Sequence, residues 1–341
     1  KDPGSPRIER LRIIHLFEAD YNFVLKLMWG RRMVYCGEDN QCFNHQQFGS
    51  RPGHQAIDAV HKKTLSYDLA RILLINLAML DNDATGCYDR IIIAIAMVCA
   101  LRLGMPKSAV RMHSRVIANL VYSVKTAHGI SDNSYRAIHR YLLFGTGQGS
   151  GASPAMWLSI VSCLLTGLSS MAPMTMKFID PWKDVINERC ADSFVDDTSD
   201  GVCDASSLEP LSADELVLYL QSVSQTWERL LYSSGGALEL RKCFWYLIYW
   251  TWTNGRPNMA TKLDLPATVS LTQGLATEPV TIVRKEPWEA MRTLGVRPAP
   301  NGNYQQEANF LKTKADTYAA RLIVSNLTRM DTFIFHRSTY T

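Results

Sequence analysis

The sequence lacks the features that mark several common protein classes. Its eight cysteines include no CxxC pair and no His/Cys pairing at zinc-ligand spacing, so neither a structural zinc nor a disulfide framework is indicated. No low-complexity tract and no secretory signal peptide is visible. Reduced thiols in an intracellular protein are therefore expected. Because the chain begins at Lys1 rather than at a methionine, we expect it to be a piece of a longer protein.

A strong net charge is also missing. The formal net charge of +4 over 341 residues is only mildly basic and does not by itself indicate a nucleic-acid-binding protein. The charge is unevenly placed, since residues 1–33 hold seven Lys/Arg against four Asp/Glu and residues 284–341 hold nine against five. The acid clusters lie in the middle of a chain that is long enough for two or more lobes.

One uncharged segment is long enough to cross a bilayer, residues 152–174, ASPAMWLSIVSCLLTGLSSMAPM. Ser, Thr and Gly are scattered through it, and Pro154 stands near its start, where a helix tolerates proline. We interpret the segment as a buried helix of a large soluble core, with a membrane span as the alternative.

Hydrophobic periodicity predicts a mixture of strands and helices. The apolar run 73–83 predicts a strand that delivers carboxylates at its end, and CFWYLIYW (243–250) is strongly β-prone. A buried helix is predicted for CYDRIIIAIAMVCALRLGMP, a helix and then a hairpin for 107–144, and a helix for 211–232. Two extended arms around a turn are predicted for the first residues, KDPGSPRIERLRII. A polar connection is expected to follow. A helix is then predicted for the second half of QFGSRPGHQAIDAVHKKTL.

Two acid clusters follow apolar runs. Asp196 and Asp197 follow Phe194-Val195 in SFVDDTSD, and the acids of 81–83 end the strand predicted before them. Adjacent like charges raise one pKa unless a cation neutralises them. A solvated turn would explain an isolated Asp-Asp pair, but a tight hairpin with the aspartates at its tip suits this stretch. Carboxylates from separate strand ends are what a two-metal phosphoryl-transfer site needs.

These acids belong to six ordered motifs that resemble those of reverse transcriptases, particularly the non-LTR (LINE-like) retrotransposon polymerases. DATGCYDRI, beginning at Asp83, resembles the first catalytic motif, QGSGASP the second, and FVDD the third. GGALELRKC, with Lys242, resembles the fourth motif, TLGV at 293–296 the fifth, and QFGSRPGHQAIDAV the upstream finger motif. The order matches the family, and the motifs cover nearly the whole chain.

The chain departs from the family pattern in two places. The finger strand usually carries Arg-Pro-Ile, where this chain has Arg12-Ile13-Ile14, and an aromatic usually follows the glycine at 49, where this chain has Ser50. The chain begins at what resembles the tip of the finger hairpin. It ends soon after the first helix of the thumb, with no endonuclease or ribonuclease H segment visible.

The resemblance implies an α+β fold, the right-hand polymerase. Residues 1–297 would form the fingers and palm, with an antiparallel palm sheet backed by helices, and residues 298–341 the truncated helical start of the thumb. The helix expected at 304–326 would be scaffold on its apolar stripe, with a basic face tracking the duplex backbone.

The implied activity is that of an RNA-directed DNA polymerase. A primer 3′-hydroxyl would attack the α-phosphate of a deoxynucleotide on an RNA template, with two Mg²⁺ ions and Mn²⁺ as a possible substitute. RNA template, DNA primer and dNTPs are the expected partners, without a membrane and with no protein partner inferable. A group II intron-like or other cellular reverse transcriptase is one alternative. The other is a catalytically dead polymerase-fold scaffold that binds RNA.

The resemblance also assigns the acids. Asp83 and Asp196 would be direct metal ligands, and Asp197 a supporting one. Asp81 is expected to be a solvated or supporting acid. Asp89 is expected to be a helix N-terminal charge favoured by the macrodipole.

The remaining site residues surround the nucleotide. Tyr88 would be the steric gate beneath the incoming sugar, with core packing as the alternative. The residues implied to face the nucleotide are Ala84, Gln148 and Gly149. Lys242 would act on the leaving pyrophosphate, by proton donation or by charge, or would be an ordinary solvated lysine. Two of three basic residues near the start would clasp the triphosphate, among Lys1, Arg10 and Arg12.

Overall fold

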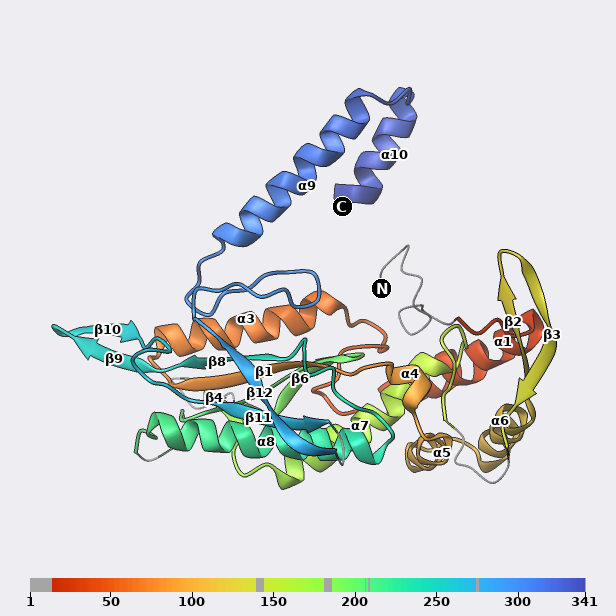
Figure 1. The fold of residues 1–341 in the computed structure, drawn as a ribbon, viewed down its shortest axis with the longest axis horizontal. Helices are drawn as coiled ribbons and strands as arrows, with labels where there is room; N and C mark the ends of the chain where they lie inside the picture. The colour runs from red at the N-terminus through yellow and green to blue at the C-terminus, as the bar shows by residue number, and fades with distance from the viewer. Residues whose placement is uncertain are drawn as a thin grey trace.

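A six-stranded sheet organises the structure (Figure 1). The computed structural model describes residues 14–138, 144–180, 186–205, 207, 209–273 and 276–340. The strand order is β11-β12-β8-β1-β7-β6. The strands are β1 (Leu77–Asp83), β6 (Ala191–Phe194), β7 (Asp197–Cys203), β8 (Phe244–Ile248), β11 (Val269–Gln273) and β12 (Ala276–Lys285).

Strand β1 lies at the centre of this sheet and confirms the strand predicted from the apolar run. It pairs with β7 on one side and β8 on the other, both antiparallel. All of its residues are buried except the last, Asp83, which is half-buried. The strand is buried because helices cover both faces of the sheet. The expectation of a purely antiparallel sheet is wrong, since β12 runs parallel to β8 over Val283–Lys285. The sheet is therefore mixed.

Three long helices cover the two faces of the sheet. Helix α3 (Ala56–Ile72) lies on one face, and α7 (Ser153–Met171) and α8 (Ala213–Ser233) lie on the other (Figure 1). Helix α8 begins with a capping box between Ser212 and Glu215, which satisfies two of its first N–H groups. These helices match the predicted ones.

Helix α7 is a buried core helix. In the part of the chain that the structure describes, it is the one helix long and apolar enough to cross a membrane by length and composition. Most of its residues are buried, with Trp157 and Leu158 in the main hydrophobic cluster. The predicted buried helix is therefore confirmed. All eight cysteines lie in described residues and are free thiols.

The end of the molecule beside residues 145–151, GTGQGSG, which we call the glycine-rich loop, is mostly helical. Residues 19–39 form one continuous helical stretch, made of α1 (Ala19–Leu25), the π-helix η2 (Lys26–Met33) and α2 (Val34–Asp39). Helix α2 lies where a polar connection was expected after residue 33. The single helix predicted from Cys87 is two helices, α4 (Cys87–Arg90) and α5 (Ile93–Arg102). They are separated because Ile92 pairs with Phe144 and its N–H donates to the Ser234 carbonyl. Helix α6 (Lys107–Asn119) and the hairpin β2 (Val121–Thr126) and β3 (Gly129–Arg136) follow as predicted.

The C-terminal helices α9 (Gln305–Ile323) and α10 (Arg329–Tyr340) project from the body of the molecule (Figure 1). Helix α9 has no buried residue, so the expectation that its apolar stripe packs as scaffold is wrong for the structure described. Two further hairpins complete the fold, β4 (Met176–Ile179) with β5 (Ile186–Arg189) and β9 (Trp250–Thr253) with β10 (Arg256–Met259). The predicted β-prone run 243–250 is therefore divided between β8 and β9.

Candidate active site

The register of β1 against β7 brings the two acid clusters together. Asp83 lies directly opposite Asp197, and Asp81 lies opposite Ser199. Asp196 stands in the turn between β6 and β7, where its backbone carbonyl accepts the N–H of Ala84 at 3.0 Å. The register therefore places the strand ends that carry the two acid clusters side by side, whereas the sharing of metal ions by the Asp83 and Asp196 carboxylates and the catalytic roles stay predictions. Because side chains alternate along a strand, Asp81 and Asp83 share one face of β1.

The turn that carries the aspartates has an unusual backbone. Val195 has φ of 59°, a conformation that β-branched residues rarely adopt. Its carbonyl accepts the indole N–H of Trp157 at 2.6 Å. Gly49 packs against the other side so closely that an added Cβ would overlap the backbone nitrogen of Val195. Such backbone strain persists only where the surroundings enforce it, and it concentrates at functional sites.

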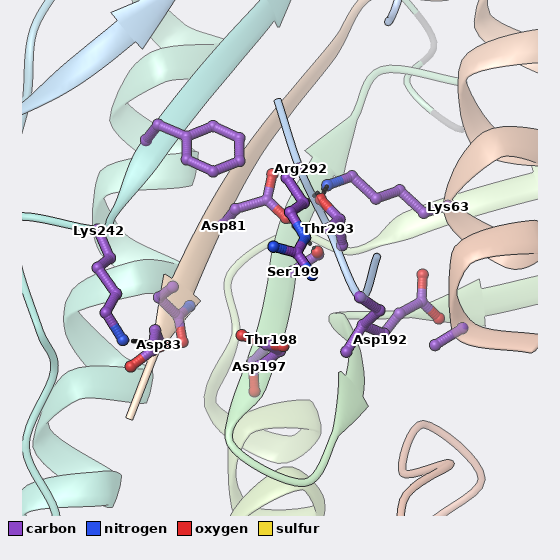
Figure 2. Close-up of a pocket in the computed structure, with 14 residues that line it drawn as sticks. Lys63, Asp81, Asp83, Asp192, Asp197, Thr198, Ser199, Lys242, Arg292 and Thr293 are labelled. Atoms are coloured by element: carbon purple, nitrogen blue, oxygen red, sulfur yellow. Dashed lines mark hydrogen bonds and ion pairs between the residues drawn. The ribbon is translucent and has the colours of Figure 1, made fainter. Parts of the chain in front are cut away.

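A cavity of about 120 Å³ opens beside Asp83 and Asp197 (Figure 2). It is lined by four carboxylates and three cationic side chains, Asp81, Asp83, Asp192, Asp197, Lys63, Lys242 and Arg292. Lys63 reaches into the cluster from α3, whereas Lys242 approaches Asp83 from the other side (Figure 2). Side chains of both charge signs therefore line a small cavity at the end of β1.

The acids influence one another electrically. Burial, followed by the charges of Asp196, Asp83 and Asp81, raises the pKa of Asp197 to about 6, and Lys242 acts in the opposite direction. The Lys242 ammonium lies 2.8 Å from Asp83 Oδ2, and this hydrogen bond is the main cause that raises the pKa of Lys242. Lys242 is thus placed in the acid cluster rather than left as a separate solvated lysine.

The donor set fits a hard divalent cation in its chemistry. Carboxylate oxygens are the ligands that Mg²⁺ prefers. Burial first, and then repulsion from the neighbouring acids, raises the pKa of Asp197, and a bound cation would relieve that repulsion. In this structure the Asp83 carboxylate engages Lys242 instead. Over the ranges that the structure describes, no three or more His, Cys, Asp or Glu side chains are already grouped to hold a metal ion. A metal at Asp83 would therefore take the place of the Lys242 ammonium there.

Asp81 is buried, so the expectation that it might be solvated is wrong. Its Oδ1 accepts hydrogen bonds from Lys63 Nζ and from Ser199 Oγ, both at 2.5 Å. Sequence reasoning missed Lys63. A usable signal was present, because Lys63 lies four residues after Ala59 and four before Tyr67, all on the buried face of α3.

The glycine-rich loop packs against α4, next to the acids. The N–H of Thr146 donates to the Tyr88 carbonyl at 2.8 Å, and the Gln148 carbonyl accepts the N–H of His15 at 2.6 Å. Gly147 and Gly149 both have positive φ and lie against His15, where a side chain would collide. Backbone contacts therefore hold the loop to Tyr88 at Thr146 and to His15 at Gln148.

The other predicted nucleotide contacts have different surroundings. Tyr88 is half-buried in the first turn of α4 and packs against the main core; burial, with smaller effects from Cys87 and Asp196, raises its pKa. Ala84 is buried. Asp89 lies exposed in the first turn of α4, where a helix N-terminal charge was predicted. The predicted triphosphate contacts, Lys1, Arg10 and Arg12, lie outside the described residues.

Comparison with known proteins gives a weak structural likeness. No family model matches the chain, and no curated protein sequence matches it. The structure is similar to telomerase from Candida albicans in complex with a TWJ fragment of telomeric RNA, with 15% identity and a TM-score of 0.44 over 68% of this chain and 35% of that one. An apo telomerase from Candida tropicalis truncated from its C-terminal domain gives 13% identity and a TM-score of 0.44 over 67% of this chain and 41% of that one.

The telomerase from Candida tropicalis in complex with the same kind of RNA fragment gives 14% identity and a TM-score of 0.44. That alignment covers 67% of this chain and 35% of the other. The present chain thus spans well under half the length of these telomerases.

Proposed function

We propose that this chain is an RNA-directed DNA polymerase that transfers a deoxynucleotide to a primer 3′-hydroxyl. The observation that carries the proposal is the pairing of Asp83 with Asp197 on neighbouring strands, with Asp196 in the adjoining turn and Lys242 at 2.8 Å from Asp83. A buried-strand end and a strained hairpin tip are held together here at the cost of charge repulsion. Such an arrangement is typical of phosphoryl transfer.

Each residue of the site has a role in this proposal. Asp83 and Asp196 would hold the metal ions, with Asp197 in support. Two Mg²⁺ ions, when bound, would activate the attacking hydroxyl and stabilise the leaving oxygen. Lys242 keeps a positive charge beside the acids, where charge develops on the leaving pyrophosphate. Gln148 would lie against the incoming nucleotide.

The six ordered motifs favour a fragment of a non-LTR retrotransposon polyprotein as the source of the chain. A group II intron-like or other cellular reverse transcriptase is the second candidate, because it would share the same acids. A catalytically dead RNA-binding scaffold is disfavoured for one reason. A scaffold has no need to keep Asp83, Asp197 and Lys242 around one cavity, with Asp196 in the adjoining turn, at the cost of charge repulsion.

Primer extension on an RNA template with Mg²⁺ tests the proposal. Changing Asp83→Asn or Asp196→Asn should abolish extension while circular dichroism and thermal unfolding show an intact fold. Asp214→Asn is the matched control, since Asp214 is an exposed acid in the first turn of α8 and does not line the cavity. Wild-type rates in either active-site variant would end the two-metal interpretation. Extension on DNA templates alone would remove the assignment to RNA.

A further inference from the structure

Asn22 joins helix α1 to the glycine-rich loop through its side-chain amide. Its Nδ2 donates to the Gly149 carbonyl at 3.0 Å, and its Oδ1 accepts the N–H of Gly151 at 2.6 Å. One amide group therefore acts as donor and acceptor to the loop at once. Because Asn22 and Gly149 are 127 positions apart in the sequence, the fold and not the local chain brings them together.

Helix propensity does not explain an asparagine at this position. Asn22 lies inside α1, where its own N–H donates to the Glu18 carbonyl at 2.9 Å. Asparagine is unfavourable within a helix, because its side chain competes for the hydrogen bonds of the backbone. The residue is only half-buried, so it contributes little to the core. What its side chain contributes is the pair of hydrogen bonds to the loop.

Gln148 needs contacts from outside the loop to have a fixed direction. Its neighbours Gly147 and Gly149 both have positive φ, at 80° and 109°. Glycine adopts positive and negative φ about equally readily, so the loop sequence does not by itself select one direction for the residue between them. Hydrogen bonds to the peptides around Gln148 must select it.

The peptides after Gln148 are held by residues just before α1 and within it. The Gln148 carbonyl accepts the N–H of His15 at 2.6 Å, which fixes the first of these peptides. Asn22 fixes the next two, one through the carbonyl of Gly149 and the other through the N–H of Gly151. Three consecutive peptides are thus held by one segment of the chain.

The part of the loop before Gln148 is held separately, by α7. Ser153 Oγ donates to the carbonyls of Thr146 and Gly147, both at 2.8 Å. Gln148 therefore lies between a part of the loop that α7 fixes and a part that Asn22 fixes. Ser153 is buried, whereas Asn22 is half-buried, so the contact at Asn22 can be removed with less disturbance to the core.

We propose that Asn22 is a positioning residue that holds the glycine-rich loop and so sets the direction in which Gln148 meets the incoming nucleotide. This inference rests on the proposed polymerase function, which assigns Gln148 to the nucleotide. Asn22 touches no reacting atom and acts through Gln148. Without its amide, the peptides after Gln148 regain the freedom of a glycine-rich chain. Nucleotide binding then weakens, while the grip on the primer–template stays the same.

Asn22→Leu is the most direct test, because leucine is close to asparagine in size, favours a helix and has neither polar atom. Asn22→Ala is the second variant, in case leucine disturbs the contact with the loop. Asn119→Ala is the matched control, since Asn119 Nδ2 donates to the Arg115 carbonyl at 2.7 Å within α6. Thermal unfolding shows whether each variant is folded.

Four quantities are measured on the full chain with Mg²⁺. The first is the binding of a fluorescent dNTP to the complex with a dideoxy-terminated primer on an RNA template. The second is the binding of that primer–template, measured by anisotropy. The third is the pair of values kcat and KM for dNTP in primer extension. The fourth is amide hydrogen exchange over 147–151, which needs no activity.

We expect Asn22→Leu to weaken dNTP binding and to raise the KM for dNTP by about tenfold, the effect of losing two hydrogen bonds of ordinary strength. The value of kcat and primer–template binding should stay within about twofold of the wild type. The Gly151 amide should exchange faster, because its acceptor is gone. In a Gln148→Ala background, Asn22→Leu should cause no further loss, since it acts through Gln148. Asn119→Ala should change none of these quantities.

Unchanged dNTP binding in both Asn22 variants would overturn the inference. Additive losses with Gln148→Ala would also overturn it, as would no effect of Gln148→Ala itself or an equal loss of primer–template binding. The failure of the proposed function gives a different result. If the wild-type protein binds dNTP and Asn22→Leu weakens this binding, but neither extends a primer, the polymerase proposal fails while the positioning role stands. If the wild-type protein binds no dNTP, the positioning inference fails.

Discussion

The indole N–H of Trp157 donates to the backbone carbonyl of Val195 at 2.6 Å, so the core helix α7 holds the turn that carries Asp196 and Asp197. The positive φ of Val195 costs on the order of 1–3 kcal/mol, which the surrounding contacts must offset. Gly49 closes the opposite side of the turn. The position of the candidate metal ligands thus depends on residues from two distant segments of the chain.

This relationship predicts that Gly49→Ala is damaging. The added methyl would overlap the backbone of Val195, which cannot move away as a flexible side chain can. We expect a loss of about 1–3 kcal/mol in the free energy of unfolding and at least about a tenfold loss of primer extension.

Gly167→Ala in the middle of α7 is the matched control. Its added methyl meets only the Leu230 side chain, at 3.6 and 3.8 Å, which is ordinary contact. It should stabilise the helix by about 0.5–1 kcal/mol and leave activity unchanged. Urea unfolding and primer extension measure both variants. Equal stability and activity in Gly49→Ala and the wild type would show that the turn tolerates displacement.

The elements that sequence reasoning predicted correctly are those with a strong local signal. Each of them combines an apolar run with a clear stop. They are the strand ending at Asp83, the hairpin around Asp196 and the buried helix that begins at Ser153. The meeting of the two acid clusters was also predictable, because both end buried strands. Local pattern and global fold agree at these places.

The missed features depend on contacts between distant segments. The parallel pairing of β12 with β8 has no local signature, and neither does the pairing of Lys63 with Asp81. A lysine at a buried helical position and an acid two residues before Asp83 were each visible, but only the fold shows that they neutralise each other. The stripe on α9 has the correct period, yet no described element covers it.

Asp200 should make the stability of the protein depend on pH. It is fully buried on β7 and accepts hydrogen bonds from Asn82 Nδ2, at 2.6 Å, and from Ser224 Oγ. Burial raises its pKa to about 7. The folded protein therefore keeps a proton that the unfolded chain has already lost, so stability falls as the pH rises from about 4 to about 7.

Asp200→Asn removes this dependence because the amide is neutral and nearly the same shape. At pH 8 we expect the variant to be more stable than the wild type by on the order of 2–4 kcal/mol, and the difference should narrow as the pH falls to about 4. Urea unfolding across this pH range is the measurement, with the exposed Asp214→Asn as the control. A variant that is less stable by the same amount at every pH would show that Asp200 is needed as a charged group.

Lys242 should act through its charge. Because Asp83 raises its pKa, the ammonium stays protonated at neutral pH and is a poor proton donor. We expect Lys242→Ala to lower kcat by on the order of a hundredfold and Lys242→Arg to stay within about tenfold of the wild type. The side chain is 61% exposed, so its ion pair with Asp83 should contribute less than about 1 kcal/mol to stability.

Single-turnover primer extension and urea unfolding test these expectations for Lys242. Arginine cannot give up its proton at neutral pH. If Lys242→Arg is as inactive as Lys242→Ala, proton transfer is the better explanation. Full activity in Lys242→Ala would make it an ordinary surface lysine.

Tyr88 should control the choice of sugar. It lies in the first turn of α4, half-buried against the core, and its carbonyl holds Thr146 of the loop that carries Gln148. The backbone at Tyr88 is therefore fixed to the loop and its side chain packs against the core; in the proposed polymerase the ring would be a rigid surface beneath the incoming sugar. A deoxyribose leaves room above the ring, whereas the 2′-oxygen of a ribose would press against it. Packing alone that excludes one hydroxyl lowers kcat/KM for the larger substrate by roughly a hundredfold, and a rigid ring can discriminate more strongly than this.

Replacing Tyr88 by Val or Ala should raise ribonucleotide incorporation much more than it lowers deoxynucleotide incorporation. The ratio of the two kcat/KM values, for the wild type and each variant, is the measurement. Because Tyr88 also packs against the core, the thermal unfolding of each variant is measured as well. We expect the Ala variant to lose about 1–3 kcal/mol in the free energy of unfolding. The Val variant separates the two roles, since it keeps more of the apolar contact while removing the ring. If both activities fall together in Tyr88→Val and their ratio does not change, Tyr88 is a packing residue and the sugar is selected elsewhere.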